Sequence, residues 1–353
     1  MKHTLSRRNF LTSSAVSTAA ISTAATAGLF SFAGSAGVSA QETPKTAESP
    51  FSSAIYKAQI VKTPDDARCE KLKSAGFDGI EVTDWGIPVE EAQKNRQITD
   101  KHGLKVHSVM RGWTNINNTD SFDKDIESVK KAFKTAAAYG ADTVLWVPCR
   151  TGGWMNPKIG KPKDGVAMPA AWDFDIDFDP ATLKVKSVAS DGDYTEYIAV
   201  QNQATEAAIK AVELLLPAAA YEGVKLGIEN VWNNLWSTPK YYAALCKYFK
   251  SPLVGPYFDL GNHTVYANPV EWLKALGIEK QPFKLHIKGF KVDEVKGKLG
   301  GGPGDWCKID EASIDWKSVR QILRDIHYNG WISVEEGGYS DEKYSQILDS
   351  IIG

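Results

Sequence analysis

The sequence is poor in features that mark several large classes of protein. It has only four cysteines in 353 residues, and Cys69, Cys149, Cys246 and Cys307 are too widely spaced for a metal-binding cysteine motif. We expect free, buried thiols, although an oxidising compartment would let them pair. An excess of basic residues is also lacking, with 41 basic against 43 acidic ones. Because nucleic-acid phosphates are bound by a basic face, nucleic acid is not expected as a partner.

The first 40 residues have the composition of an export signal. Paired Arg7 and Arg8 precede a weakly apolar stretch rich in Ala, Ser and Thr, which ends in small residues. This pattern is typical of a twin-arginine signal peptide. A membrane anchor fits less well, because so many Ser and Thr are unfavourable in lipid, and no later segment is apolar enough to span a membrane. We therefore expect a signal peptide over 1–40, a polar linker over 41–52, and a periplasmic or secreted mature protein without a membrane partner.

The remaining chain alternates β-like segments with amphipathic helix patterns. Strict alternation of this kind predicts a parallel sheet, and eight units are the number that closes a (β/α)₈ TIM barrel, which we place at 53–353. An open doubly wound sheet is the alternative, but no glycine-rich phosphate loop follows the first strand. The eight predicted strands are 54–60, 77–82, 105–110, 142–148, 225–230, 254–260, 283–290 and 331–336.

One connection is much longer than the others. About fifty residues, roughly 150–196, separate the fourth predicted strand from the next helix pattern. Loops of this length in compact domains are usually functional, and this one leaves the end of the barrel where active sites lie. We interpret it as a lid in which Trp154 and Trp172 could stack on a substrate ring. An insertion that packs its tryptophans in a small core of its own is the alternative.

Four metal-type side chains occur at the ends of the last four predicted strands. The helix-facing positions of barrel strands should be apolar, so the residues that alternate with them point into the barrel. This rule directs Glu229, Asp259, His286 and Glu335 inward at the same end. Three carboxylates in one place repel one another unless a cation compensates them. Oxygen-rich ligation with one histidine suits one divalent ion, Mn²⁺ first, with Mg²⁺ or Co²⁺ as alternatives; a ring of salt bridges to Lys288 is the other interpretation.

In the segments around these four residues, the chain resembles the xylose isomerase-like barrel superfamily, and more closely its sugar phosphate isomerase/epimerase branch. The resemblance is carried by "GVKLGIENVWNNLWSTP", "VGPYFDLGNHTVYANPVEWLKALG", "FKLHIKGFK", "IDEASIDWKSV" and "YNGWISVEE". It implies that Glu229, Asp259, His286 and Glu335 hold one divalent metal. It also implies that Glu229 and Glu335 act on opposite faces of a sugar. One would remove the proton beside a ketone, giving an enediolate held by the metal, and the other would return a proton.

The chain departs from that pattern where relatives bind substrate. Asn262 stands where many relatives have histidine, with His263 one step later, while Leu235 and Val292 replace a glutamate and an arginine of the epimerases. Substrate recognition should therefore differ. Lys288 lies on the same face of its strand as His286, and it is the candidate to contact a substrate oxygen in place of the missing residues.

Further candidate substrate contacts are Asn262, His263, Trp154 and two inward-facing residues, Glu81 and His107. A structural role is the alternative for each of these two. A small-molecule carbohydrate is the expected partner, and a homo-oligomer is compatible with the sequence. Because the chain is expected to be exported, a free keto-sugar or an oxidised glycoside fits better than a phosphorylated sugar.

The sequence supports three classes of function. The first is a metal-dependent isomerase or epimerase of a keto-sugar. The second is a 3-keto-glycoside lyase, which begins with the same proton abstraction but expels the aglycone. The third is a non-catalytic periplasmic sugar-binding protein, against which the two glutamates argue. A metal nuclease fits least, given the acidic charge and the export signal.

Overall fold

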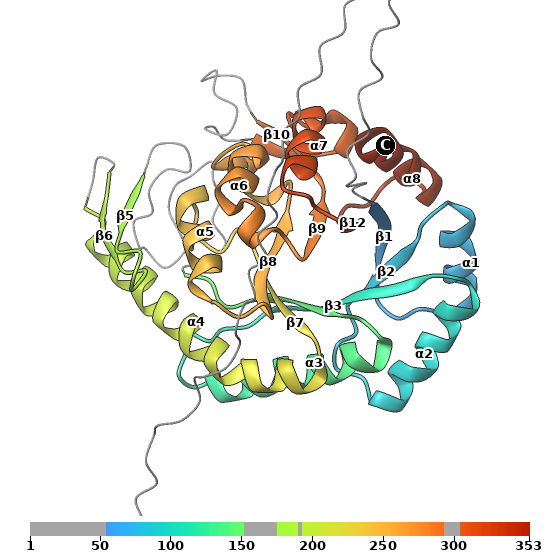
Figure 1. The fold of residues 1–353 in the computed structure, drawn as a ribbon, viewed down its shortest axis with the longest axis horizontal. Helices are drawn as coiled ribbons and strands as arrows, with labels where there is room; N and C mark the ends of the chain where they lie inside the picture. Colours follow the sequence, from blue (N-terminus) through green and yellow to red (C-terminus); the bar gives the residue numbers. More distant parts are fainter. Residues whose placement is uncertain (1–53, 152–174, 190–192, 293–303) are drawn as a thin grey trace, which may run out of the picture. The chain divides into compact units, whose positions relative to one another are not determined.

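Eight parallel strands close into a barrel surrounded by helices (Figure 1). The computed structural model describes residues 54–151, 175–189, 193–292 and 304–353. The predicted signal, the linker and both tryptophans of the predicted lid, Trp154 and Trp172, lie outside these residues. Around the barrel the strands follow the order β1, β12, β9, β8, β7, β4, β3, β2, and the predicted (β/α)₈ TIM barrel is confirmed. The barrel strands are β1 (Ile55–Val61), β2 (Gly79–Val82), β3 (Lys105–Trp113), β4 (Thr143–Val147), β7 (Lys225–Glu229), β8 (Val254–Asp259), β9 (Lys284–Ile287) and β12 (Gly330–Val334).

The sequence predicts seven helices, over 65–76, 89–103, 123–140, 205–223, 238–251, 269–277 and 313–330. The observed helices follow these patterns with two differences. The fourth helix starts about ten residues earlier than its apolar pattern, and the last one was not predicted. Gly140 and Gly223 end two of the helices in the left-handed conformation that favours glycine. The helices are α1 (Asp66–Ser74), α2 (Val89–Lys101), α3 (Phe122–Tyr139), α4 (Thr195–Glu222), α5 (Pro239–Tyr248), α6 (Pro269–Leu276), α7 (Trp316–Asp325) and α8 (Asp341–Ile352).

The alternation of side chains along the strands explains how the barrel is filled. Outward residues such as Leu226 and Ile228 join the large apolar core between strands and helices. Inside the barrel, Leu145, Val147 and Tyr257 form a separate cluster. A side chain at Gly227 would meet the Tyr257 ring at 3.0 Å, so the glycine leaves the ring its space. The barrel interior therefore combines this apolar cluster with buried polar residues such as Ser108, whose hydroxyl is 3.0 Å from that of Tyr257.

Two small antiparallel hairpins stand outside the barrel sheet. The first, β5 (Ile176–Phe178) with β6 (Val185–Val188), lies in the long connection between β4 and α4. The second, β10 (Gly289–Val292) with β11 (Gly304–Cys307), follows β9 directly. The predicted strand 283–290 is thus two strands, because the chain leaves the barrel after Lys288.

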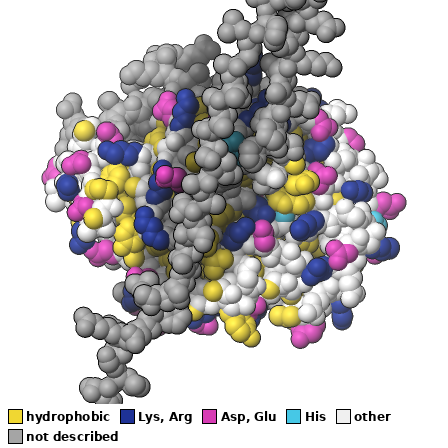
Figure 2. Space-filling model, in the orientation of Figure 1, with side chains coloured by type: hydrophobic (Ala, Val, Ile, Leu, Met, Phe, Trp, Pro, Cys, Tyr) yellow, Lys and Arg dark blue, Asp and Glu magenta, His cyan; other side chains and the backbone are white. Residues whose placement is uncertain are grey.

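The state of the cysteines and the distribution of surface charge can be compared with the sequence. All four cysteines are unpaired, three of them buried and Cys307 half-buried. Acidic and basic side chains are interspersed on the face shown in Figure 2. Within the described ranges, no helix is both long enough and apolar enough to cross a membrane.

Candidate metal centre

Four side chains from neighbouring strands meet at the carboxyl end of the barrel. Glu229 ends β7, Asp259 ends β8, His286 lies in β9 and Glu335 follows β12, and these four strands are adjacent in the barrel. One donor atom from each lies within 4.8 Å of all the others. Glu229, Asp259 and His286 are buried, whereas the side chain of Glu335 is 31 % exposed. The predicted inward direction of all four is therefore what the structure shows.

The imidazole of His286 stands at the centre of the group. Its Nδ1 lies 3.0 Å from Oε2 of Glu335, 3.7 Å from Oε1 of Glu229 and 3.9 Å from Oδ2 of Asp259. His286 Nδ1 and Asp259 Oδ2 are both buried and make no hydrogen bond of regular geometry, although Glu335 Oε2 and Lys288 Nζ lie 3.0 Å and 3.2 Å from them. Such unsatisfied polar atoms are rare inside proteins and call for an ion or a water. Their convergence fits a bound cation.

The loop after β8 fixes the orientation of Asp259. Its Oδ1 accepts hydrogen bonds from the backbone N–H groups of Gly261 at 2.7 Å and Asn262 at 2.6 Å. Its Oδ2 lies 3.2 Å from the ammonium of Lys288. One oxygen is therefore committed to the loop, and the other faces Lys288 and Nδ1 of His286.

Two asparagines brace the acids. The Asn230 side chain pairs with the backbone of Asp259, accepting from its N–H at 2.6 Å and donating to its carbonyl at 2.9 Å. Asn262 donates its amide to Oε1 of Glu229 at 3.2 Å. Asn262, expected to contact substrate, thus holds a candidate ligand. Asn230 was missed, although it directly follows Glu229 in the sequence.

Glu81 lies behind the histidine and not at the mouth where the sequence suggested it. Both side chains are completely buried, and Oε2 of Glu81 lies 2.7 Å from Nε2 of His286. A carboxylate on one ring nitrogen sets the orientation of a metal-ligating imidazole and raises its basicity. Nε2 therefore donates to Glu81, and Nδ1 faces the three other candidate ligands.

The electrostatics of the cluster show what a cation would relieve. Burial raises the pKa of Asp259 to about 7 and also raises the pKa of Glu229. Burial acts in the same direction on Glu335, but the charges of His286 and Lys288 outweigh it and hold its pKa well below the usual range. For His286, burial lowers the pKa, yet the nearby carboxylates overcome it and raise the pKa well above its ordinary value.

Lys288 forms salt bridges with two of the acids, and such salt bridges were the alternative to a metal site in the sequence analysis. Its ammonium lies 2.7 Å from Oε2 of Glu335 and 3.2 Å from Oδ2 of Asp259. Glu229 has no such partner within the described part of the chain; its ion-pair contact is with His286. Lysine and histidine thus offset only part of the negative charge. Three carboxylates and one imidazole are a donor set that suits Mn²⁺, Mg²⁺ or Co²⁺.

The two histidines that were predicted as candidate substrate contacts, His107 and His263, make their polar contacts outside the group of four candidate ligands. Nε2 of His107 is 2.9 Å from Oγ of Ser333, and the ring stacks on Trp331 at 4.8 Å. Burial lowers its pKa well below the usual value, so it is neutral. His263 donates from Nε2 to the carbonyl of Val231 at 3.0 Å, and its ring packs against Trp272 at 4.5 Å. Burial lowers the pKa of His263 to about 4.

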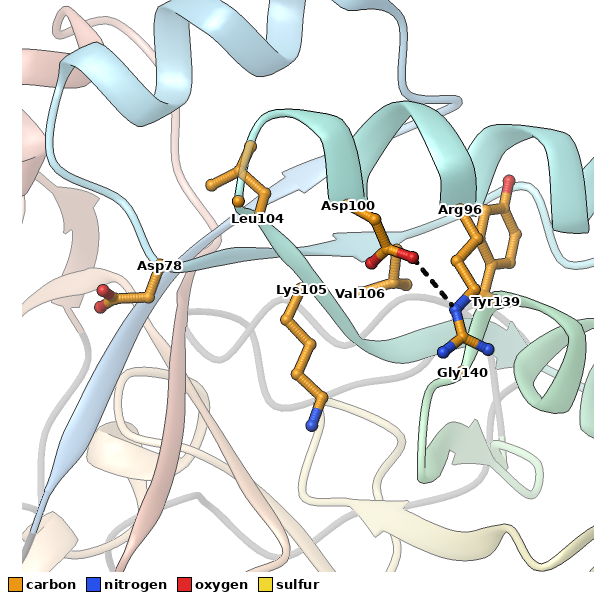
Figure 3. Close-up of a pocket in the computed structure, with 9 residues that line it drawn as sticks. Asp78, Arg96, Asp100, Leu104, Lys105, Val106, Tyr139 and Gly140 are labelled. Atoms are coloured by element: carbon orange, nitrogen blue, oxygen red, sulfur yellow. Dashed lines mark ion pairs between the residues drawn. The ribbon is translucent and has the colours of Figure 1, made fainter.

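A separate pocket of about 260 Å³ opens at the other end of β2 and β3 (Figure 3). Arg96 and Asp100 form an ion pair there at 3.5 Å, and Lys105 is the first residue of β3. TIM-barrel enzymes place their active sites at the carboxyl end of the strands. The pocket is therefore on the wrong end of the barrel to be the active site.

Comparison with curated proteins gives one partial match. Over 131 residues the chain is 30 % identical to the uncharacterized protein MJ1311 of Methanocaldococcus jannaschii, covering 36 % of this chain and 42 % of that protein. The chain therefore spans about two fifths of the length of that relative, and the match carries no activity.

Solved structures share the fold across most of the chain. A mannonate dehydratase from Streptococcus suis has a TM-score of 0.59 at 14 % identity, covering 85 % of this chain and 94 % of its own. The apo 3-keto-D-glucoside 4-epimerase of E. coli has a TM-score of 0.58 at 12 % identity, with coverages of 84 % and 98 %. A xylose isomerase-like TIM barrel protein from Mycobacterium smegmatis, in complex with magnesium, has a TM-score of 0.54 at 18 % identity, with coverages of 85 % and 98 %.

The family model gives the assignment that these low identities do not. The model described as "xylose isomerase-like TIM barrel" matches residues 69–351, which include all four candidate ligands and Glu81. The resemblance of the sequence motifs, the closed barrel and the family model agree. The chain belongs to the xylose isomerase-like TIM barrel family.

Proposed function

We propose that this protein is a divalent-metal-dependent isomerase or epimerase that moves a proton next to the carbonyl of a keto-sugar. The observation that carries the proposal is the convergence of Glu229, Asp259, His286 and Glu335, whose donor atoms lie within 4.8 Å of one another. One of the structural relatives is a 3-keto-D-glucoside 4-epimerase, which supports a keto-sugar as the substrate class.

The strand order suggests how the two glutamates divide the work. Glu229 and Glu335 come from the outer two of four adjacent strands, β7 and β12, with Asp259 and His286 between them. A sugar bound over the middle pair would have one glutamate on each side. One carboxylate can then accept the proton from carbon while the other donates a proton to the opposite face. A divalent ion held by the four side chains would polarise the sugar carbonyl as a Lewis acid.

Lys288 has the position to stabilise negative charge on the substrate. Its side chain is 14 % exposed, and its ammonium already bridges carboxylate oxygens of Glu335 and Asp259. A substrate oxygen that gains negative charge beside these acids would draw the same ammonium as a hydrogen-bond donor. Lys288 would in this way replace the contacts that Leu235 and Val292 cannot provide.

The first experiment measures metal and then turnover. We expect about one divalent ion per purified chain, lost in both Asp259→Ala and His286→Ala. The loaded protein is then incubated with ketopentoses, ketohexoses and keto-glycosides in D₂O. An isomerase or epimerase conserves the mass of the sugar apart from deuterium gained at carbon. A protein that takes up none of Mn²⁺, Co²⁺ or Mg²⁺ would contradict the proposal, and sugar binding without exchange would make it a binding protein.

A lyase acting on 3-keto-glycosides is the second candidate, and the surroundings of two residues favour it. Leu235 and Val292 are both buried among apolar residues, so neither position can offer a polar contact to a free sugar. The same proton abstraction followed by departure of the aglycone would release a smaller product. In the D₂O experiment, release of the aglycone would identify a lyase, whereas deuterium incorporation into the intact substrate would identify an isomerase or epimerase.

The cellular location of the protein is proposed from its amino-terminal sequence. Paired Arg7 and Arg8 support export by the twin-arginine route to the periplasm or beyond. Replacing both arginines by lysine should retain the protein in the cytoplasm, as measured by cell fractionation. Unchanged export of that variant would refute this route.

A further inference from the structure

An exposed aromatic platform adjoins the candidate metal centre. It consists of Trp232, Phe290 and Trp306, and Trp306 is the outermost member with 47 % of its surface exposed. Its ring centre lies 4.8 Å from that of Trp232 and 5.1 Å from that of Phe290. Large exposed aromatic rings backed by other rings often mark binding surfaces.

The platform is held firmly in place relative to the ligands. Phe290 and Trp306 are paired across the β10–β11 hairpin, which continues the chain from His286 and Lys288. Trp232 donates its indole N–H to the carbonyl of Asn262, whose side chain holds Glu229. A side chain at Gly304 would meet the carbonyl of Lys291 at 2.1 Å, so the hairpin strands lie very close together. The rings are therefore fixed before any substrate binds.

Lys288 connects the platform to the most exposed ligand. Its ammonium lies 5.2 Å from the ring centre of Trp306 and 2.7 Å from Oε2 of Glu335. These two distances place the Trp306 ring centre within about 8 Å of that oxygen. At such a separation, a ring at the carboxylates and a ring on Trp306 can belong to one substrate. Glu335 is also the candidate ligand whose side chain is most open to solvent, so the group is reached from solvent on this side.

We propose that Trp306 forms a subsite for a second ring, joined through a glycosidic oxygen to the sugar that reacts at Glu229 and Glu335. The substrate is then a glycoside and not a free monosaccharide. The occupant can be a second sugar or an aromatic aglycone, since both present a flat apolar face to an indole. This inference rests on the proposed function and specifies its substrate class.

The test compares binding of matched probes to the magnesium-loaded full chain by calorimetry. The probes are methyl β-D-glucoside, cellobiose and phenyl β-D-glucoside, together with the corresponding galactose and xylose compounds. Trp306→Ala removes the ring, Trp306→Phe keeps an aromatic face, and Tyr221→Ala is the control for removing an exposed ring elsewhere, since Tyr221 is 87 % exposed on α4. Circular dichroism and metal content verify that each variant is folded and loaded.

We expect a probe with a second ring to bind about 3- to 10-fold more tightly than the methyl glycoside of the same sugar, as one aromatic contact provides. Trp306→Ala should abolish this gain, while Trp306→Phe and Tyr221→Ala should largely keep it. Cellobiose and the phenyl glucoside identify which second ring is preferred. If the second ring adds nothing, or its gain survives in Trp306→Ala, the subsite is refuted and the proposed function stands. If no sugar binds and none turns over, both are refuted.

Discussion

Replacing Glu81 by glutamine should weaken metal binding although Glu81 is not itself a candidate ligand. The two side chains have the same shape, so the change removes the charge of the carboxylate that accepts from Nε2 of His286 at 2.7 Å. A buried hydrogen bond to a charged group contributes about 1.5–3 kcal/mol. Loss of such a partner from a ligand histidine weakens metal binding about 10- to 100-fold, which is about 1.4–2.7 kcal/mol. The two estimates of the effect agree.

The assay is urea unfolding of wild type and Glu81→Gln with and without divalent metal. At a metal concentration about 100 times the wild-type Kd, binding adds about 2.7 kcal/mol to the free energy of unfolding. With a Kd 10- to 100-fold weaker, the same concentration adds only about 1.4 to 0.4 kcal/mol to the variant. A competing chelator gives the two Kd values independently.

Asp142→Asn is the matched control. Asp142 lies 2.7 Å from the ammonium of Lys284, the first residue of β9, at the opposite end of the strand that carries His286. This control removes the carboxylate that pairs with Lys284, which lies on the same strand as His286 but is not one of the candidate ligands. It should leave the metal Kd unchanged. If Glu81→Gln also keeps the wild-type Kd, Glu81 stabilises the barrel interior without acting on the metal, and the reasoning fails.

Three further predictions follow from the site and its packing. Glu229→Gln and Glu335→Gln should each slow proton transfer at least about 10²-fold, as measured by deuterium incorporation from D₂O, because each removes a proton-transfer group. The metal-free protein should lose stability as the pH rises from 5 towards 7. The raised pKa of Asp259, about 7, means that the folded state holds more protons than the unfolded state. The slope should approach about 1.4 kcal/mol per pH unit for each extra proton, and urea unfolding with saturating metal should abolish it. Trp272→Ala should lower the free energy of unfolding by about 3–5 kcal/mol in the same assay, because this fully buried ring fills the space behind His263.

The sequence predicted the barrel and the direction of its ligands because both depend on a period of two. The apolar residues Leu285 and Ile287 face the helices, and this fixes His286 on the opposite side without any knowledge of the neighbouring strands. Inward direction, however, does not say which inward residues touch. Glu81 meets His286 from another strand, next to a register shift where Glu81 pairs with Ser108 and not with His107. Such a bulge leaves no clear mark in a strand of ordinary β-forming residues.

Asn230 and the hairpin that carries Trp306 were missed for a second reason, which is that they lie beyond the ends of the barrel strands β7 and β9. Strand periodicity places a ligand, but the residues that follow depend on where the chain turns, as it does directly after Lys288. The candidate metal ligands lie at the ends of the barrel strands, while Trp306 belongs to a hairpin attached to the barrel. TIM barrels change substrate through such segments while the strand ends retain the chemistry. Metal binding should therefore survive changes to the aromatic platform, and preference among glycosides should not, so the two properties can be measured separately in one chain.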